Sequence, residues 1–245
     1  MTGQTELLIV TLARLLLDAR SVAAGASSPI PGAAMLLRAT DRQRPIRMSM
    51  LGSSKHNFFT NGTVELFDAA GQGRIDAFFL GGGQIDGGGN VNLVGAGEYP
   101  RSKVRWPGTF GSAYLYFVVP KVILFREEHS RRVLVEKVDF ISAPGTSAPN
   151  IYRKGGPAAL LTSKCLFHFD QAAGRFRLAS LHPGVTLEEV RDCTGFQFDL
   201  APGLGETPGP TPQEADALRT RVAKELAETY PEFARKLERE LLQAA

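Results

Sequence analysis

The sequence predicts an α/β protein with an open, mainly parallel sheet covered by helices, followed by a C-terminal helical extension. Short apolar runs alternate with amphipathic segments over the first 80 residues, a glycine-rich loop follows the third run, and the last 40 residues show a helical pattern. With 245 residues the chain can hold one large domain and an extension. We therefore expect residues 1–205 to form the α/β domain and residues 206–245 a helical tail.

The first half of the chain supplies the alternating pattern. Leucines recur at helical spacing over residues 5–18, which predicts an amphipathic helix. Apolar, strand-like runs then alternate with helix-like segments. Strands are expected at 21–25, 46–51 and 75–80, and helices at 33–40 and 63–70.

The second half predicts a more β-rich arrangement. Strands are expected at 114–119, 121–125, 133–138, 164–169, 175–181 and 196–200. The polar residues 126–132 and the turn at 170–174 are each expected to join two strands as a hairpin. Residues 144–156 are expected to form a long surface loop, because proline and glycine recur in them.

Capping signals mark two helices near the C-terminus. Thr186 and Glu189 predict a capping box for a short helix that ends near residue 193. After a linker at 202–210, Thr211 and Glu214 predict a second capping box, with Pro212 at the first helical position. The apolar stripe of this last helix fits either packing on its own domain or a contact with another subunit.

Composition excludes several classes of protein. A net charge of +3 is too small to indicate binding to nucleic acid or to an anionic membrane. The two cysteines form no disulfide framework and suit a reducing cytoplasm. The apolar run at 7–17 is too short to cross a bilayer and contains Arg14. We expect a cytoplasmic protein.

The chain is organised around the glycine-rich residues 78–93. An apolar strand there ends in one glycine triplet, at 81–83, and a second triplet follows at 87–89. Neither gives the dinucleotide fingerprint, because the required third glycine is replaced by Asp86 or Asn92, and no phosphate-binding P-loop occurs. Ligands bind past the carboxyl ends of strands in open α/β sheets, so we expect this loop to form the floor of an active site. A structural glycine hinge is the alternative.

Metal and serine-nucleophile chemistry are both disfavoured. Cys165 and His168 are three residues apart on a predicted strand and therefore point to opposite faces, so no metal site is expected. The chain has no nucleophile elbow of the Gly-x-Ser-x-Gly type. A Ser–Lys or Ser–His pair within residues 53–56 stays conceivable, although neighbours on an extended chain rarely face one another.

Three clusters could together build a site. Backbone amides of residues 81–92 could stabilise a developing oxyanion, and residues 108–113, with Gly108 and Gly111, could add further donors. Arg126 leaves a buried strand, so its guanidinium could bind a carboxylate bidentately. The alternative for Arg126 is an exposed hairpin charge paired with Glu127 or Glu128. The basic residues within 101–105 could meet phosphates or simply form a solvated edge.

Four motifs in order carry a resemblance to a known family. They are Ser-Pro-Ile-Pro-Gly-Ala-Ala at 28–34, the glycine-rich stretch at 81–92, Trp-Pro-Gly-Thr-Phe-Gly-Ser at 106–112, and the His-Pro-Gly segment at 182–196. The chain resembles the β subunit of the family I coenzyme A transferases, of the glutaconate CoA-transferase type, over most of residues 5–200. The resemblance implies a three-layer α/β/α domain and a separate α subunit, usually in an α2β2 assembly.

One departure from the family bears on the chemistry. In the transferases, a β-subunit glutamate after the second strand becomes a covalent CoA thioester, but here no glutamate occurs between Asp41 and Glu65. Without that carboxylate this mechanism lacks its nucleophile on this chain. The chain therefore resembles more closely the branch of the family that hydrolyses a cyclic β-keto acyl-CoA ring in actinobacterial steroid and cholesterol degradation.

That branch implies specific roles. The catalytic glutamate is expected on the α subunit, and Arg126 is the candidate clamp for a carboxylate or enolate. The candidate residues for binding substrate or CoA are Lys55, His56 and Asn57 at the vacated glutamate position, together with Gly82, Gly83, Gln84, Asn90, Gly108 and Gly111. Coenzyme A enters only as part of the substrate, and no other cofactor or metal is expected. A genuine CoA-transferase subunit and a non-catalytic ligand-sensing domain are the alternatives.

Overall fold

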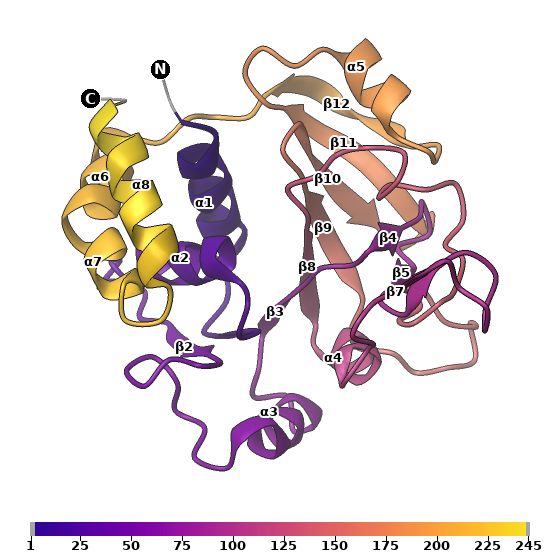
Figure 1. The fold of residues 1–245 in the computed structure, drawn as a ribbon, viewed down its shortest axis with the longest axis horizontal. Helices are drawn as coiled ribbons and strands as arrows, with labels where there is room; N and C mark the ends of the chain where they lie inside the picture. Colours follow the sequence, from indigo (N-terminus) through magenta and orange to yellow (C-terminus); the bar gives the residue numbers. More distant parts are fainter. Residues whose placement is uncertain (1–2, 244–245) are drawn as a thin grey trace. The chain divides into compact units, whose positions relative to one another are not determined.

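The computed structural model describes residues 3–243 (Figure 1). The chain forms two compact units. Unit 1 contains residues up to 69, residues 74–79 and the chain from 208 onward, and unit 2 contains residues 70–73 and 80–207. The contacts thus group the C-terminal helices with the N-terminal elements, whereas the sequence placed a boundary between residues 205 and 206. Among residues 3–243, no helix is both long enough and apolar enough to span a bilayer.

Unit 1 is built on a parallel sheet with β1 (Ser21–Ala24) at its centre. β1 pairs with β2 (Arg47–Met50) on one side and with β3 (Ala77–Leu80) on the other. All four residues of β1 and of β3 are buried, as expected for strands covered on both faces. Because the pairing is parallel, the three strands end at the same edge, where the loops beginning at residues 25, 51 and 81 leave the sheet.

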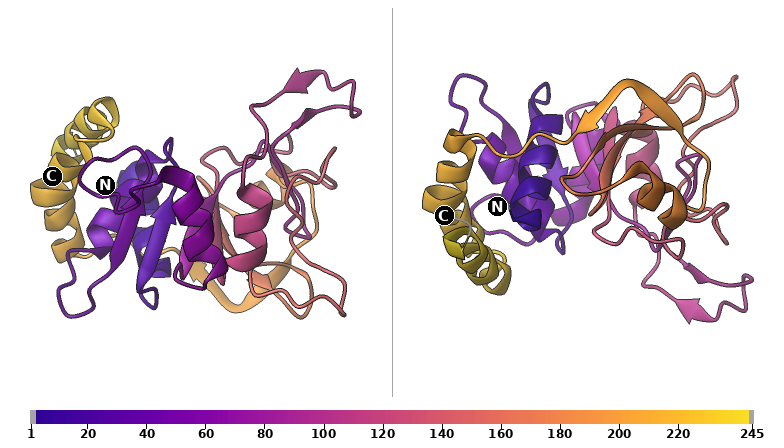
Figure 2. Two further views of the ribbon diagram at one scale, coloured as in Figure 1. Left: turned by 90° about the horizontal axis from the view of Figure 1, so that it is seen from below. Right: turned by 90° about the horizontal axis from the view of Figure 1, so that it is seen from above.

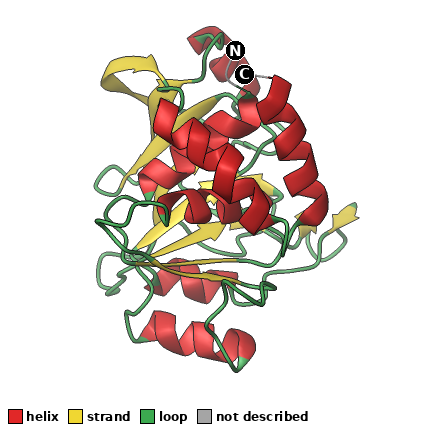
Figure 3. Cartoon of the chain, turned by 90° about the vertical axis from the view of Figure 1, so that its left-hand side faces the viewer, coloured by secondary structure: helices red, strands yellow, loops and turns green. Residues whose placement is uncertain are grey.

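Helices supply the rest of the regular structure in unit 1 (Figure 3). α1 and α2 pack against each other with most of their residues buried, and α2 begins at Pro29, which suits a first helical position. The C-terminal segment contains a π-helical turn, η1, between α6 and α7. The bounds are α1 Gln4–Leu15, α2 Pro29–Arg38, α3 Gly62–Gly71, α6 Pro212–Ala217, η1 Leu218–Val222, α7 Ala223–Leu226 and α8 Pro231–Gln243.

Arg14 attaches the C-terminal segment to α1. Its guanidinium donates to both carboxylate oxygens of Glu214, at 3.0 and 2.6 Å, and to the carbonyls of Pro208 and Gly209. Glu214 also completes the predicted capping box with Thr211. Within the described chain this segment packs on its own unit, and the contact with another subunit stays a prediction.

Unit 2 contains five neighbouring strands of mixed direction, in the order β8-β9-β10-β11-β12. β8 pairs with β9, and β11 with β12, in parallel, while β10 is antiparallel to both of its neighbours. The predicted hairpin at 170–174 is confirmed as the β10–β11 connection. The strands are β8 Lys121–Phe125, β9 Pro157–Leu161, β10 Cys165–Asp170, β11 Arg175–Leu181 and β12 Asp199–Glu206.

Aromatic side chains form much of the core of unit 2. Phe167 and Phe176 are fully buried, and Phe196 packs against both, with ring centroids 6.0 and 5.6 Å away. Two helices, α4 (Ser112–Val118) and α5 (Leu187–Cys193), complete the unit. Two small ladders pair β4 (Gln84–Ile85) with β5 (Val91–Asn92) and β6 (Gly95–Ala96) with β7 (Val104–Arg105); the second projects as an arm (Figure 2).

Three predicted elements of unit 2 are wrong. The predicted strand at 114–119 is helix α4. An apolar run of that length fits either a strand or a helix, and packing in the folded chain selects between the two. The predicted hairpin between 121–125 and 133–138 does not form; β8 instead pairs in parallel with β9, which lies just after the predicted long loop. The last strand, β12, begins at Asp199 rather than at 196.

Candidate active site

The glycines at 82, 83 and 87 allow close packing rather than unusual backbone angles. A Cβ on Gly83 would lie 2.3 Å from ring carbons of Trp106, and one on Gly82 would lie 2.6 Å from Cγ1 of Val91. Gly87 similarly faces Phe196, at 3.0 Å. Gly89 is the loop glycine with a left-handed backbone, at φ 72°. The glycine-rich loop is therefore a tightly packed turn.

Gln84 and Asn92, both buried, form a hydrogen-bond network with the exposed Asp139 beside this loop. Asn92 Nδ2 donates to Gln84 Oε1 at 2.7 Å, and Gln84 Nε2 donates to Asp139 Oδ2 at 2.9 Å. The backbone amide of Asp139 returns a hydrogen bond to Gln84 Oε1 at 3.0 Å. Because both polar ends of Gln84 are engaged within the protein, its side chain sets the shape of the loop.

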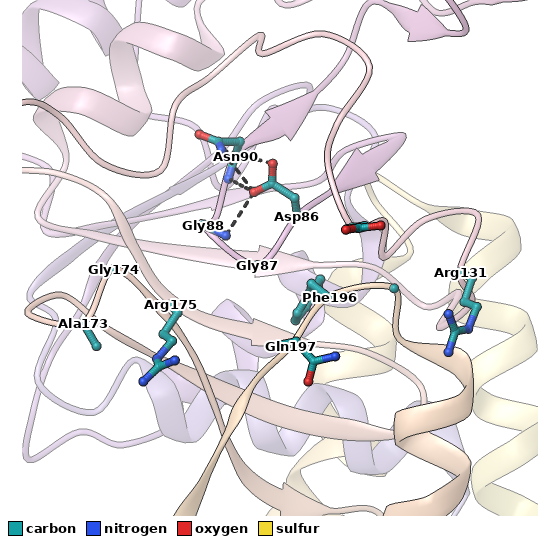
Figure 4. Close-up of a pocket in the computed structure, with 12 residues that line it drawn as sticks. Asp86, Gly87, Gly88, Asn90, Arg131, Ala173, Gly174, Arg175, Phe196 and Gln197 are labelled. Atoms are coloured by element: carbon teal, nitrogen blue, oxygen red, sulfur yellow. Dashed lines mark hydrogen bonds between the residues drawn. The ribbon is translucent and has the colours of Figure 1, made fainter.

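Asp86 and Asn90 close the tip of the loop. Asp86 Oδ1 accepts from the amides of Gly88 and Asn90 at 3.0 and 3.1 Å, and from Asn90 Nδ2 at 3.1 Å (Figure 4). Asn90 Oδ1 in turn accepts from the amide of Gly145 at 3.1 Å. The polar side chains at the tip thus satisfy one another, which a compact turn of this shape requires.

A hollow of about 680 Å³ lies beside the loop tip. Figure 4 shows Arg131, Arg175, Phe196 and Gln197 around the hollow, with the guanidinium of Arg175 and the amide of Gln197 directed away from Asp86 and Asn90. Its lining residues are Asp86, Gly87, Gly88, Asn90, Arg131, Glu136, Ala173, Gly174, Arg175, Gly195, Phe196 and Gln197. Of the predicted binding residues, Asn90 therefore lines this hollow, whereas Gly82, Gly83, Gln84 and Arg126 do not.

Most amides of the loop already donate within the protein. The amide of Gly83 donates to the Asn92 carbonyl, and that of Ile85 donates to the Val133 carbonyl. The amides of Asp86, Gly88, Gly89 and Asn90 are bonded inside the turn itself. Any oxyanion role of this loop therefore depends on other amides, such as that of Gly82.

Arg126 lies next to the start of the glycine-rich loop. It follows β8 directly, and a Cβ on Gly81 would lie 3.3 Å from the carbonyl oxygen of Phe125. Its terminal nitrogen is 4.0 Å from Glu128 Oε2, while its Nε is buried without a hydrogen-bond partner. Glu128 is engaged more closely by Ser130 and Arg132, which together lower the pKa of its carboxyl. Arg126 thus keeps donor capacity beside the loop.

The motif at 106–112 contacts the same loop through its tryptophan. The amide of Trp106 donates to the Val94 carbonyl at 2.9 Å, and its ring covers Gly83. Gly108 has φ 105° and is exposed, and Gly111 is the residue before α4. The structure therefore brings Trp106, rather than the predicted Gly108 and Gly111, against the glycine-rich loop.

In unit 1, the loop after β2 carries Lys55, His56 and Asn57. Asn57 Oδ1 accepts from Ser49 Oγ at 2.5 Å, and His56 Nε2 lies 3.6 Å from Glu225 Oε2. The amides of Lys55 and His56 both donate to Ser53 Oγ. The side chain of Lys55 is exposed. Ser53 is thus a turn-forming residue here and makes no pair with Lys55 or His56 of the kind a nucleophile needs.

A buried histidine cluster in unit 2 was not predicted from the sequence. His129 lies 2.7 Å from Thr162 Oγ1 and 3.0 Å from Thr194 Oγ1, and burial lowers its pKa to about 4. His182 lies 2.9 Å from the Thr162 carbonyl and 2.9 Å from Thr207 Oγ1. Every ring nitrogen has a partner, so the cluster joins the connections after β8, β9, β11 and α5 and exposes no free group. No sequence signal paired these distant residues.

The strand geometry that argued against a Cys–His metal pair is confirmed. Cys165 is buried on one face of β10, while His168 is exposed on the other. Burial raises the pKa of the Cys165 thiol to about 12. Within residues 3–243, no three side chains among histidine, cysteine, aspartate and glutamate are grouped so as to hold a metal ion.

The curated relatives are subunits of enzymes whose names describe different reactions. The B subunit of 3-oxoadipate CoA-transferase from Pseudomonas knackmussii is 36% identical over 161 residues, which cover 63% of this chain and 62% of that protein. The IpdB subunit of the cholesterol ring-cleaving hydrolase from Rhodococcus jostii is 29% identical over 159 residues, with the same coverage of 63% and 62%. The matched region thus spans about three fifths of the length of these relatives.

Solved structures show the same fold. The decarboxylase AibA/AibB matches with a TM-score of 0.77 at 22% identity, covering 97% of this chain and 99% of that chain. Glutaconate coenzyme A-transferase from Acidaminococcus fermentans matches with a TM-score of 0.77 at 22% identity, covering 89% and 94%. These likenesses confirm the predicted α/β fold of the coenzyme A transferases.

The family itself follows from the sequence match. The model of the family described as coenzyme A transferase matches residues 1–192. This range includes β1 to β3, the glycine-rich loop, Trp106 and the first part of the His182 segment, up to residue 192. The chain belongs to the coenzyme A transferase family.

Proposed function

We propose that this chain is the B-type component of a heteromeric enzyme that acts on an acyl-CoA and hydrolytically opens a cyclic β-keto acyl-CoA, as in steroid degradation. The catalytic glutamate is supplied by an α-type subunit, and the two chains form a cytoplasmic α2β2 assembly. Support for a partner comes from the relatives, which are named as the B subunits of their enzymes. Support for ring cleavage comes from the likeness to the IpdB subunit.

The observation that carries the proposal is the loop after β2. Residues 51–57 contain no carboxylate, although the resemblance expects the transferase nucleophile after the second strand. A carboxylate does reach this loop from Glu228, but it accepts hydrogen bonds from Ser53 and Ser54. A carboxylate held in this way is a poor candidate for a free nucleophile. This favours hydrolysis over transfer through a glutamyl thioester on this chain.

The reaction needs stabilised negative charge more than a covalent carrier. The oxygen of water bonds to the ring ketone carbon, and the carbon–carbon bond next to it breaks. The proton that water loses passes to the glutamate of the α-type subunit. The electron pair of the broken carbon–carbon bond passes to the α-carbon, where the thioester delocalises it as an enolate until that carbon takes up the proton. The product is an open-chain acid that retains its CoA ester. Arg126 would bind the developing enolate or carboxylate charge, as a positioned cation can.

The remaining predicted residues take supporting roles in this proposal. The amide of Gly82 can add a donor beside Arg126, and Gly83 with Gln84 fixes the loop. Asn90, Gly108 and Gly111 contribute to the walls that contact the acyl-CoA. Lys55, His56 and Asn57 occupy the position of the vacated glutamate. Coenzyme A takes part as a portion of the substrate, with no separate cofactor.

A genuine CoA-transferase is the second candidate. The higher identity, 36%, to the B subunit of a 3-oxoadipate CoA-transferase favours it over the 29% likeness to the ring-cleaving hydrolase. In that case another residue must carry CoA, because residues 42–64 contain no glutamate. The two candidates differ in whether an acceptor acid is required.

An isotope experiment separates the two reactions. The chain, co-purified with its α-type subunit, is incubated with a cyclic β-keto acyl-CoA in H₂¹⁸O, with and without a free carboxylic acid. Ring hydrolysis predicts one ¹⁸O in the new carboxylate, no need for the acid, and an unchanged intact mass of this chain. A CoA adduct on this chain, or turnover only when the acid is present, would exclude the proposed hydrolase.

A further inference from the structure

We infer that the turn between α7 and α8, through Glu228 and Tyr230, positions the two loops that follow β1 and β2. This clamp belongs to unit 1 and joins segments that are 175 to 204 residues apart in the chain. Neither residue lies in the part matched by the family model, which ends at residue 192. Its effect on turnover rests on the proposed function, whereas its effect on loop conformation does not.

Glu228 holds the loop after β2 at two consecutive serines. Ser53 Oγ donates to Glu228 Oε2 at 2.6 Å, while the amide and hydroxyl of Ser54 both donate to Oε1 at 2.7 Å. Thr229 Oγ1 adds a fourth donor, at 2.5 Å. Hydrogen bonds to a charged acceptor are stronger than neutral ones, so this carboxylate is the main anchor of the loop.

The hydroxyl of Ser53 links Glu228 to the predicted site residues Lys55 and His56. Ser53 Oγ gives its proton to Glu228 and accepts from the amides of Lys55 and His56, at 3.3 and 2.9 Å. The His56 carbonyl then accepts from the amide of Met50, at 2.7 Å, which returns the loop to the end of β2. Removal of Glu228 therefore releases the backbone that carries Lys55 and His56.

Tyr230 holds the loop after β1 in the same way. Its hydroxyl donates to the Ala26 carbonyl at 2.8 Å and accepts from the amide of Ser28 at 3.2 Å. Its ring packs at the start of α2, where a Cβ on Gly32 would lie 3.3 Å from a ring carbon. Both loops leave the carboxyl ends of parallel strands, the edge where open α/β sheets bind ligands. The clamp therefore sets the geometry of one half of that edge.

Glu228 is suited to positioning and not to nucleophilic attack. Both of its oxygens are occupied by donors from Ser53, Ser54 and Thr229, and these hydrogen bonds lower the pKa of its carboxyl to about 2. An anion that is already stabilised by several donors has little remaining nucleophilicity. Its contribution to the reaction is to hold the loop.

Hydrogen exchange of the full-length chain tests the clamp directly. Amides of residues 54–56 should exchange about tenfold faster in Glu228→Ala than in the wild type, and less so in Glu228→Gln, which keeps an acceptor for the Ser54 amide. The control is Glu232→Gln on α8, an exposed glutamate outside the clamp. Tyr230→Phe should raise exchange at the Ser28 amide while leaving residues 54–56 protected. Unchanged exchange at 54–56 in Glu228→Ala would overturn the inference.

Kinetics of the complex then test the consequence for function. With the α-type subunit present, Glu228→Gln should lower kcat while the thermal unfolding midpoint stays near that of Glu232→Gln, because the change is confined to a loop. If Glu228→Gln kept wild-type turnover and wild-type exchange at residues 54–56, the clamp would be rejected and the proposed function would stand. Altered exchange in an assembly that processes no acyl-CoA would reject the proposed function and leave the clamp standing. Covalent CoA on Glu228 would reject its assignment as a positioning residue.

Discussion

Substitution of Gly83 by alanine should displace the ring of Trp106. The added Cβ would lie 2.3 Å from two ring carbons, whereas carbon atoms in contact are about 3.5 to 4.0 Å apart. The ring must therefore move by roughly 1 Å or more. Overpacking costs about 1 to 3 kcal/mol, and the lower end applies here because the Trp106 ring is only half-buried and can yield.

Fluorescence reads this displacement at a single position, because Trp106 is the only tryptophan in the chain. Gly83→Ala should shift the emission maximum to longer wavelength as the ring becomes more exposed, and urea unfolding should show a loss of about 1 kcal/mol. The matched control is Gly88→Ala in the same loop, whose Cβ would meet its nearest neighbour at 3.4 Å. It should leave the emission maximum unchanged.

A double-mutant cycle decides whether the contact is the cause. In a Trp106→Ala background, Gly83→Ala should cost nothing further, as measured by circular dichroism during urea unfolding. If Gly83→Ala cost as much without the indole ring as with it, the close approach would not explain the glycine. Identical emission from Gly83→Ala and the wild type would refute the contact itself.

Three further substitutions test the role of Arg126, the buried histidine cluster and the attachment of the C-terminal segment by Arg14. Arg126→Ala in the complex should lower turnover about 10²-fold, the scale of a single oxyanion donor; unchanged kinetics would reduce it to a surface charge. His129 stays neutral in the folded state down to its pKa of about 4, while the unfolded state takes up a proton below about 6.5. The free energy of unfolding should therefore fall by up to about 3 kcal/mol as the pH is lowered from 6.5 to 4. In His129→Gln, the free energy of unfolding measured with urea should fall less steeply over the same pH range. Arg14→Ala should cost about 1 to 2 kcal/mol, through its bonds to Glu214 and two carbonyls; the exposed Arg20→Ala, assayed alongside by thermal unfolding, should cost less.

The sequence anticipated what short-range patterns encode. Apolar runs identified β1 and β3, because a strand buried on both faces favours a mainly apolar stretch. The capping box of Thr211 was found because its signal lies within four residues. The loss of the transferase glutamate was likewise visible, since it depends only on which residues are present after β2.

Pairing between distant segments escaped sequence reasoning. Residues 133–138 were predicted to pair with β8 as a hairpin. Instead, β8 pairs with β9, about 35 residues away. Two adjacent β-rich runs look the same whether they pair with each other or with something remote, because burial by the rest of the fold selects the partner. The helical state of α4 was missed for the same reason.

By itself, the sequence determined an α/β protein of the coenzyme A transferase type with a glycine-rich loop after β3 and no glutamate after β2. Only the tertiary structure decided what the key side chains do: Gln84 and Asn90 are engaged in hydrogen bonds to other residues of the protein, and Glu228 reaches a loop far away in the chain. The physical reason is that residue types and spacings record local backbone preferences, whereas a hydrogen-bond partner 175 residues away exists only once the chain has packed.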